Sequence, residues 1–145
     1  MYTPFVKTDL VTLFNALADR TRLRLLNLMS GGEVCVCYFV ELLDEPQPKI
    51  SRHLAYLRRA GLVSARREGK WMHYRLVTPD DATQARVLEC ALAAASEERQ
   101  MQRDRERFER ACCAVRLPEP LQNAPRPHPA FRRGDEGRSN SESRS

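Results

Sequence analysis

The sequence predicts a mainly α-helical domain that carries one small β-hairpin. Apolar residues recur at helical spacing in successive segments, which indicates several amphipathic helices. Two β-like runs, residues 62–67 and 70–76, flank Glu68-Gly69, and this pattern is typical of a hairpin with glycine in its turn. With 145 residues, the chain is long enough to bury its own core as one domain.

The first two helices are predicted over residues 8–18 and roughly 20–29. Each segment places large apolar residues on one face, as helices that pack into a core do. Asp19 is suited to cap the second helix, because its carboxylate can accept a hydrogen bond from a free backbone N–H. Gly31-Gly32 then ends that helix.

A third element is predicted over residues 33–44. A helix is favoured by its length and by the apolar residues on one face. The β-branched and aromatic content of residues 34–40 leaves a strand as the alternative. Pro46 ends the element, because the residue before a proline avoids the α-helical region.

A fourth helix is predicted to begin at Pro48, which suits the first helical position because no N–H donor is needed there. Gly61 ends this helix. The helix has an apolar face and an opposite polar face. The apolar face consists of Ile50, Leu54 and Leu57, and the polar face of Lys49, Arg52, Tyr56 and Arg59.

The third and fourth helices are joined by a short turn around residues 45–48. These are the proportions of a helix-turn-helix, whose second helix enters the major groove of DNA. The hairpin that follows carries Arg66, Arg67 and Lys70 near its tip, where they could reach phosphates or a minor groove. A helix-turn-helix followed by a basic hairpin is a winged helix-turn-helix, which is therefore the predicted fold class.

A long helix is predicted from about residue 80 to 115. Its first half is small and apolar at helical spacing, so it could pack with the first helix against a symmetry mate, and a homodimer is expected. Its second half, residues 97–110, mixes acids and bases and is predicted to be a solvated helix. We expect residues 1–117 to form the DNA-binding and dimerisation domain, and the Pro-, Arg- and Ser-rich residues 118–145 to be disordered.

Basic residues are concentrated in one stretch of the chain. Residues 49–75 contain eight Lys or Arg and one acid, so this stretch carries +7 while the whole chain carries +5. Such a local concentration indicates a polyanionic partner, here operator double-stranded DNA. The chain has no run of 18 apolar residues, and its start lacks the pattern of a secretion signal. We therefore expect a cytoplasmic protein with no membrane contact.

Five cysteines carry the candidate chemistry of the chain: Cys35, Cys37, Cys90, Cys112 and Cys113. In a cytoplasmic protein such residues are more often metal-binding or reactive than disulfide-bonded. Thiolates select soft, thiophilic ions. In an ideal helix Cys35 and Cys37 point about 200° apart, so both could bind one atom only if the start of the helix distorts.

Four segments in order resemble the ArsR/SmtB family of metal-sensing winged-helix repressors: ALADRTRLRLLNLM, GEVCVC, QPKISRHLAYLRRAGLV and REGKWMHYRL. Within the family, Cys35-Val36-Cys37 resembles the arsenic-responsive branch. The resemblance implies a homodimer that binds operator DNA when ligand-free and needs no cofactor to do so. It also implies that As(III) or Sb(III) acts as the inducer, releasing the protein so that a resistance operon is transcribed.

The sequence departs from the arsenic branch at two positions. Val40 stands where a third cysteine is common, and Tyr38 stands where an aspartate often follows the pair. A third sulfur could come from Cys112 or Cys113, from either subunit, or from an external thiol such as glutathione. Because some arsenic and antimony sensors of the family carry cysteines on the C-terminal helix, a separate site at Cys112 and Cys113 is a rival.

The candidate metal ligands are therefore Cys35, Cys37, Cys112 and Cys113. Cys90, alone on an apolar helix face, is expected to be a core residue. A zinc site is disfavoured, because the zinc-sensing branch of the family uses histidines on the last helix and residues 80–115 contain none.

The candidate DNA contacts are Gln47, Lys49, Ser51, Arg52 and His53 of the fourth helix, with Arg66, Arg67 and Lys70 of the hairpin. Arg52 could bind guanine with two hydrogen bonds, and Gln47 could read adenine. Lys49 and Ser51 are better suited to phosphates. The hairpin would add affinity that depends on salt concentration.

Two other functions are compatible with the cysteines. A winged-helix regulator that senses thiol oxidation would use either cysteine pair, and this remains the alternative. A redox enzyme such as an arsenate reductase is disfavoured, because residues 33–39 contain no Gly- or Arg-rich loop that could cradle an anion. We therefore predict that the protein is not an enzyme.

Overall fold

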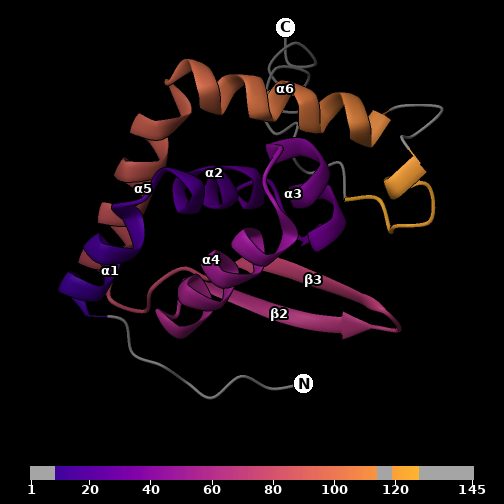
Figure 1. Ribbon diagram of the computed structural model, residues 1–145. Helices are drawn as coiled ribbons and strands as arrows, with labels where there is room; N and C mark the ends of the chain where they lie inside the picture. Colours follow the sequence, from indigo (N-terminus) through magenta and orange to yellow (C-terminus); the bar gives the residue numbers. More distant parts are fainter. Residues whose placement is uncertain (1–8, 114–118, 128–145) are drawn as a thin grey trace, which may run out of the picture.

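The computed structural model describes residues 9–113 and 119–127, apart from the side chain of Cys113. The helices and strands in these ranges are α1 (Leu10–Leu17), α2 (Arg20–Met29), β1 (Val34–Cys35), α3 (Val36–Leu43), α4 (Gln47–Arg59), β2 (Val63–Glu68), β3 (Trp71–Leu76), α5 (Ala82–Ser96), α6 (Arg99–Cys113) and the 3-10 helix η1 (Glu119–Leu121) (Figure 1). None of these helices is both long and apolar enough to cross a bilayer.

Helix α2 lies at the centre of the fold. It contacts α1, α4, α5, α6 and β3, and its residues 24–29 are all buried. Figure 1 shows α6 lying across α2 and α3 on one side, with the β2–β3 hairpin on the opposite side. The predicted cap of α2 is confirmed, since the Asp19 carboxylate accepts a hydrogen bond from the Arg22 N–H at 3.0 Å. The mainly α-helical prediction is therefore confirmed.

The helix-turn-helix consists of α3, the turn at residues 44–46 and α4. Asp44 ends α3 in the left-handed conformation, with φ +54°. Helix α4 begins at Gln47, so Pro48 occupies the second helical position and not the predicted first one. A proline is tolerated there because the N–H groups of the whole first turn have no partner within the helix.

Gly61 ends α4 as predicted. Its φ of +80° is a left-handed conformation that glycine adopts without strain. The Leu62 N–H donates to the Leu57 carbonyl at 3.0 Å, and the Gly61 N–H donates to the Arg58 carbonyl at 3.1 Å. These two bonds form a Schellman motif, which satisfies the last carbonyls of α4 and turns the chain into β2.

The wing is the antiparallel pair β2 and β3, joined by Gly69-Lys70. Gly69 has φ +59°, as the first central residue of a type II′ turn requires. Strand β1 pairs with the other side of β3, with Cys35 opposite His73, so the strand order is β1-β3-β2. The predicted hairpin is confirmed. The sheet has a third strand, β1, in a region where the sequence favoured a helix and left a strand as the alternative.

The third predicted element contains both alternatives that the sequence left open. Val34 and Cys35 form β1, and α3 starts only at Val36. A helix beginning at residue 33 is therefore wrong at its start, because pairing with β3 holds the first residues extended. Cys35 is the N-cap residue of α3, with φ −71° and ψ 140°.

The predicted long helix is in fact two helices, α5 and α6, with a break at residues 97–98. Nor is α6 fully solvated: it buries Met101, Asp104 and Phe108, and it packs on α2 and α3. The sequence pattern does not reveal this buried face, because one of its charged residues, Asp104, is itself buried as the partner of Arg24.

Part of the tail that the sequence predicts to be disordered is folded. Residues 119–121 form η1, which packs on α3, and Leu121 is fully buried. Apolar burial is the physical reason, since one leucine and one alanine, Ala124, fit against the core despite the surrounding prolines. Residues 128–145 lie outside the described residues, so the domain boundary at residue 117 stays a prediction.

Candidate DNA interface and thiol cluster

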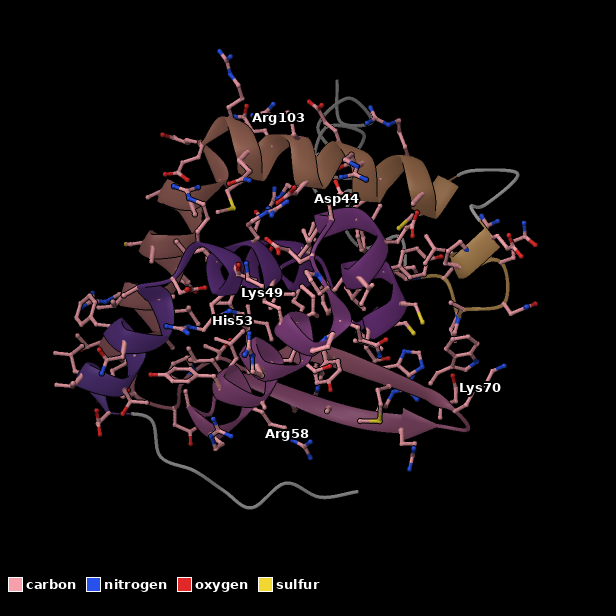
Figure 2. All side chains as sticks on the ribbon, viewed as in Figure 1. Asp44, Lys49, His53, Arg58, Lys70 and Arg103 are labelled. Atoms are coloured by element: carbon pink, nitrogen blue, oxygen red, sulfur yellow. The ribbon has the colours of Figure 1, made fainter. Side chains whose placement is uncertain are left out.

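The outer face of α4 carries most of the predicted base readers. Gln47, Ser51 and Arg52 are exposed. Lys49 is partly exposed, and its Nζ binds Glu45 Oε2 at 3.0 Å. Figure 2 shows Lys49 on α4, between the α6 side of the molecule and the hairpin. Three of the predicted contacts are thus free to enter a groove, whereas Lys49 is shared with an acid at the start of the helix.

His53 is turned toward α2. Its Nδ1 lies 3.7 Å from the Asp19 carboxylate and 3.4 Å from Arg22 Nη1. Burial lowers the pKa of the His53 imidazole, and this outweighs the opposite effect of the Asp19 charge. His53 is therefore neutral near pH 7 and holds α4 against the start of α2, while a DNA contact from it stays a prediction.

The wing holds one of its three predicted DNA contacts in an ion pair. Arg66 donates two hydrogen bonds to the Glu33 carboxylate, at 2.7 and 2.8 Å, and they lower the pKa of that carboxyl. Arg67 and Lys70 are exposed; Lys70 lies at the tip of the hairpin in Figure 2, with Nζ 5.0 Å from the ring centroid of Trp71. Of the three predicted contacts on the wing, Arg67 and Lys70 are thus exposed outside any ion pair that the structure shows, and Arg66 is bound to Glu33.

His73 lies next to this ion pair and joins it to the sheet. The side chain is buried, with Nε2 3.1 Å from Glu68 and Nδ1 3.9 Å from Glu33. Because His73 is also opposite Cys35 in the sheet, Glu33 and His73 connect β1 to the wing. Sequence reasoning missed both residues, since only the strand register brings them together.

The Cys35 and Cys37 thiols lie together at the start of α3. Cys35 is 1% exposed and Cys37 is half-buried, and the two thiols are close enough to hydrogen bond. Burial raises the pKa of Cys35 to about 11, and the neighbouring Cys37 charge adds to this effect. The predicted 200° separation does not apply, because Cys35 precedes the helix and only Cys37 lies in it. No unwinding of α3 is needed to bring the two sulfurs together.

Tyr38 brings a third cysteine into the same region. The ring is fully buried, 6.1 Å from that of Phe108 between centroids, and the hydroxyl has no hydrogen-bond partner among the described residues. Burial raises the pKa of Tyr38 most, and the charges of Cys112, Cys35 and Cys37 raise it further. The Tyr38 ring thus connects the start of α3 to α6, the helix that carries Cys112.

The remaining cysteines differ in their surroundings. Cys112 is half-buried and packs against the core near the end of α6. Cys113 is the last residue of α6, and its side chain lies outside the described part of the structure. Cys90 is exposed on α5, so the prediction that it belongs to the core is wrong; its helix face is open to solvent in the single chain.

Helix α6 is anchored to both α2 and α3 by charged side chains. Arg24 donates two hydrogen bonds to Asp104, at 2.7 and 2.9 Å, and both side chains are buried. Arg107 donates to the Leu42 carbonyl at 2.6 Å and to the Asp44 carboxylate at 2.9 Å. The second contact places α6 on the last turn of α3, directly before the turn that leads into α4.

The described residues do not form a ready-made cation site. Within residues 9–112 and 119–127, no three side chains of the types His, Cys, Asp and Glu are already grouped as metal ligands. The thiol donors suit a soft, thiophilic ion, and the unpartnered Tyr38 hydroxyl could donate to a bound sulfur or oxygen. The described thiols are thus soft donors that are not arranged as a finished metal site.

The three-stranded sheet with its β2–β3 wing, and the helix-turn-helix that ends in the basic α4, together define a winged helix-turn-helix DNA-binding regulator. Residues 19–65 match the arsR family of bacterial regulatory proteins. The arsenical resistance operon repressor of Escherichia coli K12 is 50% identical over 80 residues, which span 54% of this chain and 68% of that protein. The chain therefore belongs to the arsR family, and it is a transcriptional regulator and not an enzyme.

Other relatives agree with this assignment. The arsenic resistance transcriptional regulator ArsR1 of Pseudomonas putida is 52% identical over 65 residues, covering 44% of this chain and about half, 51%, of that protein. Among solved structures, the AntR antimony-specific transcriptional repressor is 31% identical with a TM-score of 0.50, covering 69% of this chain and 97% of that chain. Reduced HlyU from Vibrio cholerae N16961 is 31% identical with a TM-score of 0.52, covering 61% and 88%.

Proposed function

We propose that the protein is a cytoplasmic, homodimeric repressor that binds operator DNA when ligand-free and is released by As(III) or Sb(III), so that an arsenic-resistance operon is transcribed. The observation that carries the proposal is the position of Cys35 and Cys37, which lie together where β1 passes into the first helix of the DNA reader. The arsenical repressors among its relatives support the same inducer chemistry.

The proposed switch acts through the two elements that the cysteines join. Cys35 lies in β1, which pairs with wing strand β3 at His73. Cys37 lies in the first turn of α3, which leads directly into α4. A metalloid bound by both sulfurs therefore displaces the wing and the reading helix relative to one another. A coupling of about 1–3 kcal/mol between ligand and DNA is enough for such a response.

An exposed apolar face supports the proposed dimer. The large apolar side chains that are exposed among the described residues all lie on α1: Leu10, Val11 and Phe14, which are 47%, 70% and 53% exposed. Helix α1 contacts α5, so both helices lie at the same end of the fold (Figure 1). A two-fold interface there would bury these side chains, and a dimeric reader of this class contacts half-sites about one DNA turn, roughly 34 Å, apart.

The experiment that tests the proposal is fluorescence anisotropy with DNA from upstream of the protein's own gene. The full chain, reduced with a phosphine, should bind the DNA and be released by micromolar arsenite. The double variant Cys35→Ser/Cys37→Ser should bind DNA as before but ignore arsenite. Cys90→Ser, which changes an exposed thiol outside the cluster, should respond like the wild type.

Cys112 and Cys113 define the rival inducer site, and the same assay separates it. Full response in Cys35→Ser/Cys37→Ser, together with loss of response in Cys112→Ser/Cys113→Ser, would move the inducer site to the end of α6. Loss of response in the first variant, with DNA binding kept, supports the site at the start of α3.

The second candidate function is a thiol-redox sensor, which the closeness of the two thiols favours. Against it stands the burial of Cys35, because the raised pKa keeps this thiol protonated and oxidants react with thiolates. Peroxide that abolishes DNA binding, combined with arsenite that leaves binding intact in a reduced sample, would establish the redox function and overturn the metalloid one.

A further inference from the structure

We infer that Cys112 of the same chain supplies the third sulfur to the metalloid bound by Cys35 and Cys37. This inference rests on the proposed function. It means that the third sulfur comes neither from an external thiol nor from the partner subunit. It assigns the end of α6, about 75 residues from the thiol pair in sequence, to the inducer site.

The packing of α6 on α3 directs Cys112 toward the thiol pair. Phe108 and Cys112 are four residues apart on α6, so they share one face of that helix. The Phe108 ring packs against Tyr38, which directly follows Cys37. Cys112 is half-buried against the core on this same face, so its side chain faces the start of α3.

The returning chain segment supports a ligand from the same chain. After α6, the chain comes back and packs η1 on α3, with Leu121 fully buried. Arg126 of this segment donates from Nη1 to the Cys112 carbonyl at 3.3 Å. The end of α6 is therefore held beside α3 by residues of its own chain.

The Tyr38 hydroxyl is an independent indication of a ligand at this place. It is fully buried, lacks a hydrogen-bond partner among the described residues, and belongs to the ring that packs against Phe108, one helical turn before Cys112. Leaving a buried hydroxyl without a hydrogen-bond partner is unfavourable, so a partner is expected in the working protein. A thiolate sulfur bound to As(III) carries negative charge and can accept a hydrogen bond from the Tyr38 hydroxyl.

The binding step balances without an oxidant or reductant. Arsenous acid carries three hydroxyl groups on As(III); each of three thiols forms one As–S bond, and each of the three displaced hydroxyl groups leaves as water with the thiol proton. Arsenic stays trivalent throughout.

Because the three sulfurs are not yet grouped, ligation must draw the end of α6 and the start of α3 together. Arg107 holds α6 to the other end of α3, so the closure tilts α3 relative to α6.

X-ray absorption spectroscopy of the arsenite complex counts the sulfurs directly. The full-length wild type and Cys90→Ser, prepared in phosphine with no other thiol, should each give three As–S bonds. Cys112→Ser should give two As–S bonds and one As–O bond, and Cys113→Ser should keep three. Three As–S bonds in Cys112→Ser would overturn the inference while leaving the proposed function standing. No arsenic bound by the wild type would instead overturn the proposed function.

Mixed dimers decide between the two subunits as the source of the third sulfur. One subunit carries Cys35→Ser/Cys37→Ser and the other carries Cys112→Ser, each with a different affinity tag. If all three sulfurs come from one chain, the mixed dimer contains no three-sulfur site. If Cys112 reaches across the dimer, one three-sulfur site remains, and this result would overturn the inference.

Discussion

The DNA-reading surface and the thiol cluster are built in opposite ways. The predicted DNA contacts come from one continuous stretch, residues 47–70, on a helix and the hairpin that follows it. The proposed thiol site combines the end of β1, the start of α3 and the end of α6. The reading surface is thus formed by local folding, whereas the cluster exists only when distant segments are docked.

This difference indicates which half of the molecule can act as a switch. A surface fixed within one stretch keeps its shape, and only its placement can change. A site made of separately docked segments can pull on each of them when it binds a ligand. The expected consequences below are ordered from the largest effect to the smallest.

The largest loss of stability is expected when the buried ion pair that anchors α6 to α2 is removed. In Arg24→Ala the buried Asp104 carboxylate loses both of its hydrogen bonds, and an uncompensated buried charge costs about 3–5 kcal/mol. Urea unfolding should report this loss. The matched control is Arg20→Ala, whose pair with Glu98 is 58% and 49% exposed and should contribute about 0–1 kcal/mol. Equal losses in the two variants would contradict the role of the buried anchor.

The burial of Cys35 should make the free energy of unfolding fall at alkaline pH. The folded state holds the Cys35 proton more tightly than the unfolded chain does, so its contribution is complete below about pH 9 and is lost as pH rises toward about 11. The free energy of unfolding should fall by at most about 3 kcal/mol over this range. Cys35→Ala should remove this component, and Cys90→Ala should keep it; an identical pH profile in both would show that Cys35 is not its source.

Two variants of the reading surface should differ in kind. Arg52→Ala removes a candidate base contact and should weaken binding to the operator by about 1–3 kcal/mol, with little effect on unrelated DNA. Lys70→Ala should weaken binding to all sequences and lower the salt slope by about 1. Arg103→Ala serves as control, because Figure 2 shows Arg103 on α6, away from α4 and the hairpin. An unchanged preference for the operator in Arg52→Ala would remove it from the readers.

The smallest effect is expected at the link between the two halves. Glu33→Gln breaks the ion pair with Arg66, which is half exposed, so stability should change by only about 0–1 kcal/mol. The released Arg66 can then reach phosphates, and DNA affinity should rise slightly at low salt. Glu89→Gln on α5 makes the same change in net charge, and an equal rise there would mean that charge alone is responsible.

The same contrast explains what the sequence could predict. The helix-turn-helix, the hairpin and the buried face of α4 follow from local periodicity, from the Gly61 stop and from the Gly69 turn. These features depend on residues close in sequence, where spacing alone determines which side chains share a face.

The failures concern contacts between distant segments. The buried face of α6 depends on the pair of Arg24 and Asp104, which are 80 residues apart. The binding of Arg66 to Glu33 requires the register of β1 on β3. The docking of Leu121 on α3 is hidden by a proline-rich composition. No local pattern encodes these pairings.

The shortness of β1 has a consequence for the sensitivity of the proposed sensor. With two residues, this strand is joined to β3 by few backbone hydrogen bonds, each of which contributes about 0.5–1.5 kcal/mol net. Little free energy is therefore spent in moving Cys35 away from the wing, and the dose of metalloid that triggers release is set mainly by the sulfur bonds. A longer β1 would add to the free energy of this movement, so the proposed sensor would need a higher metalloid concentration before it released DNA.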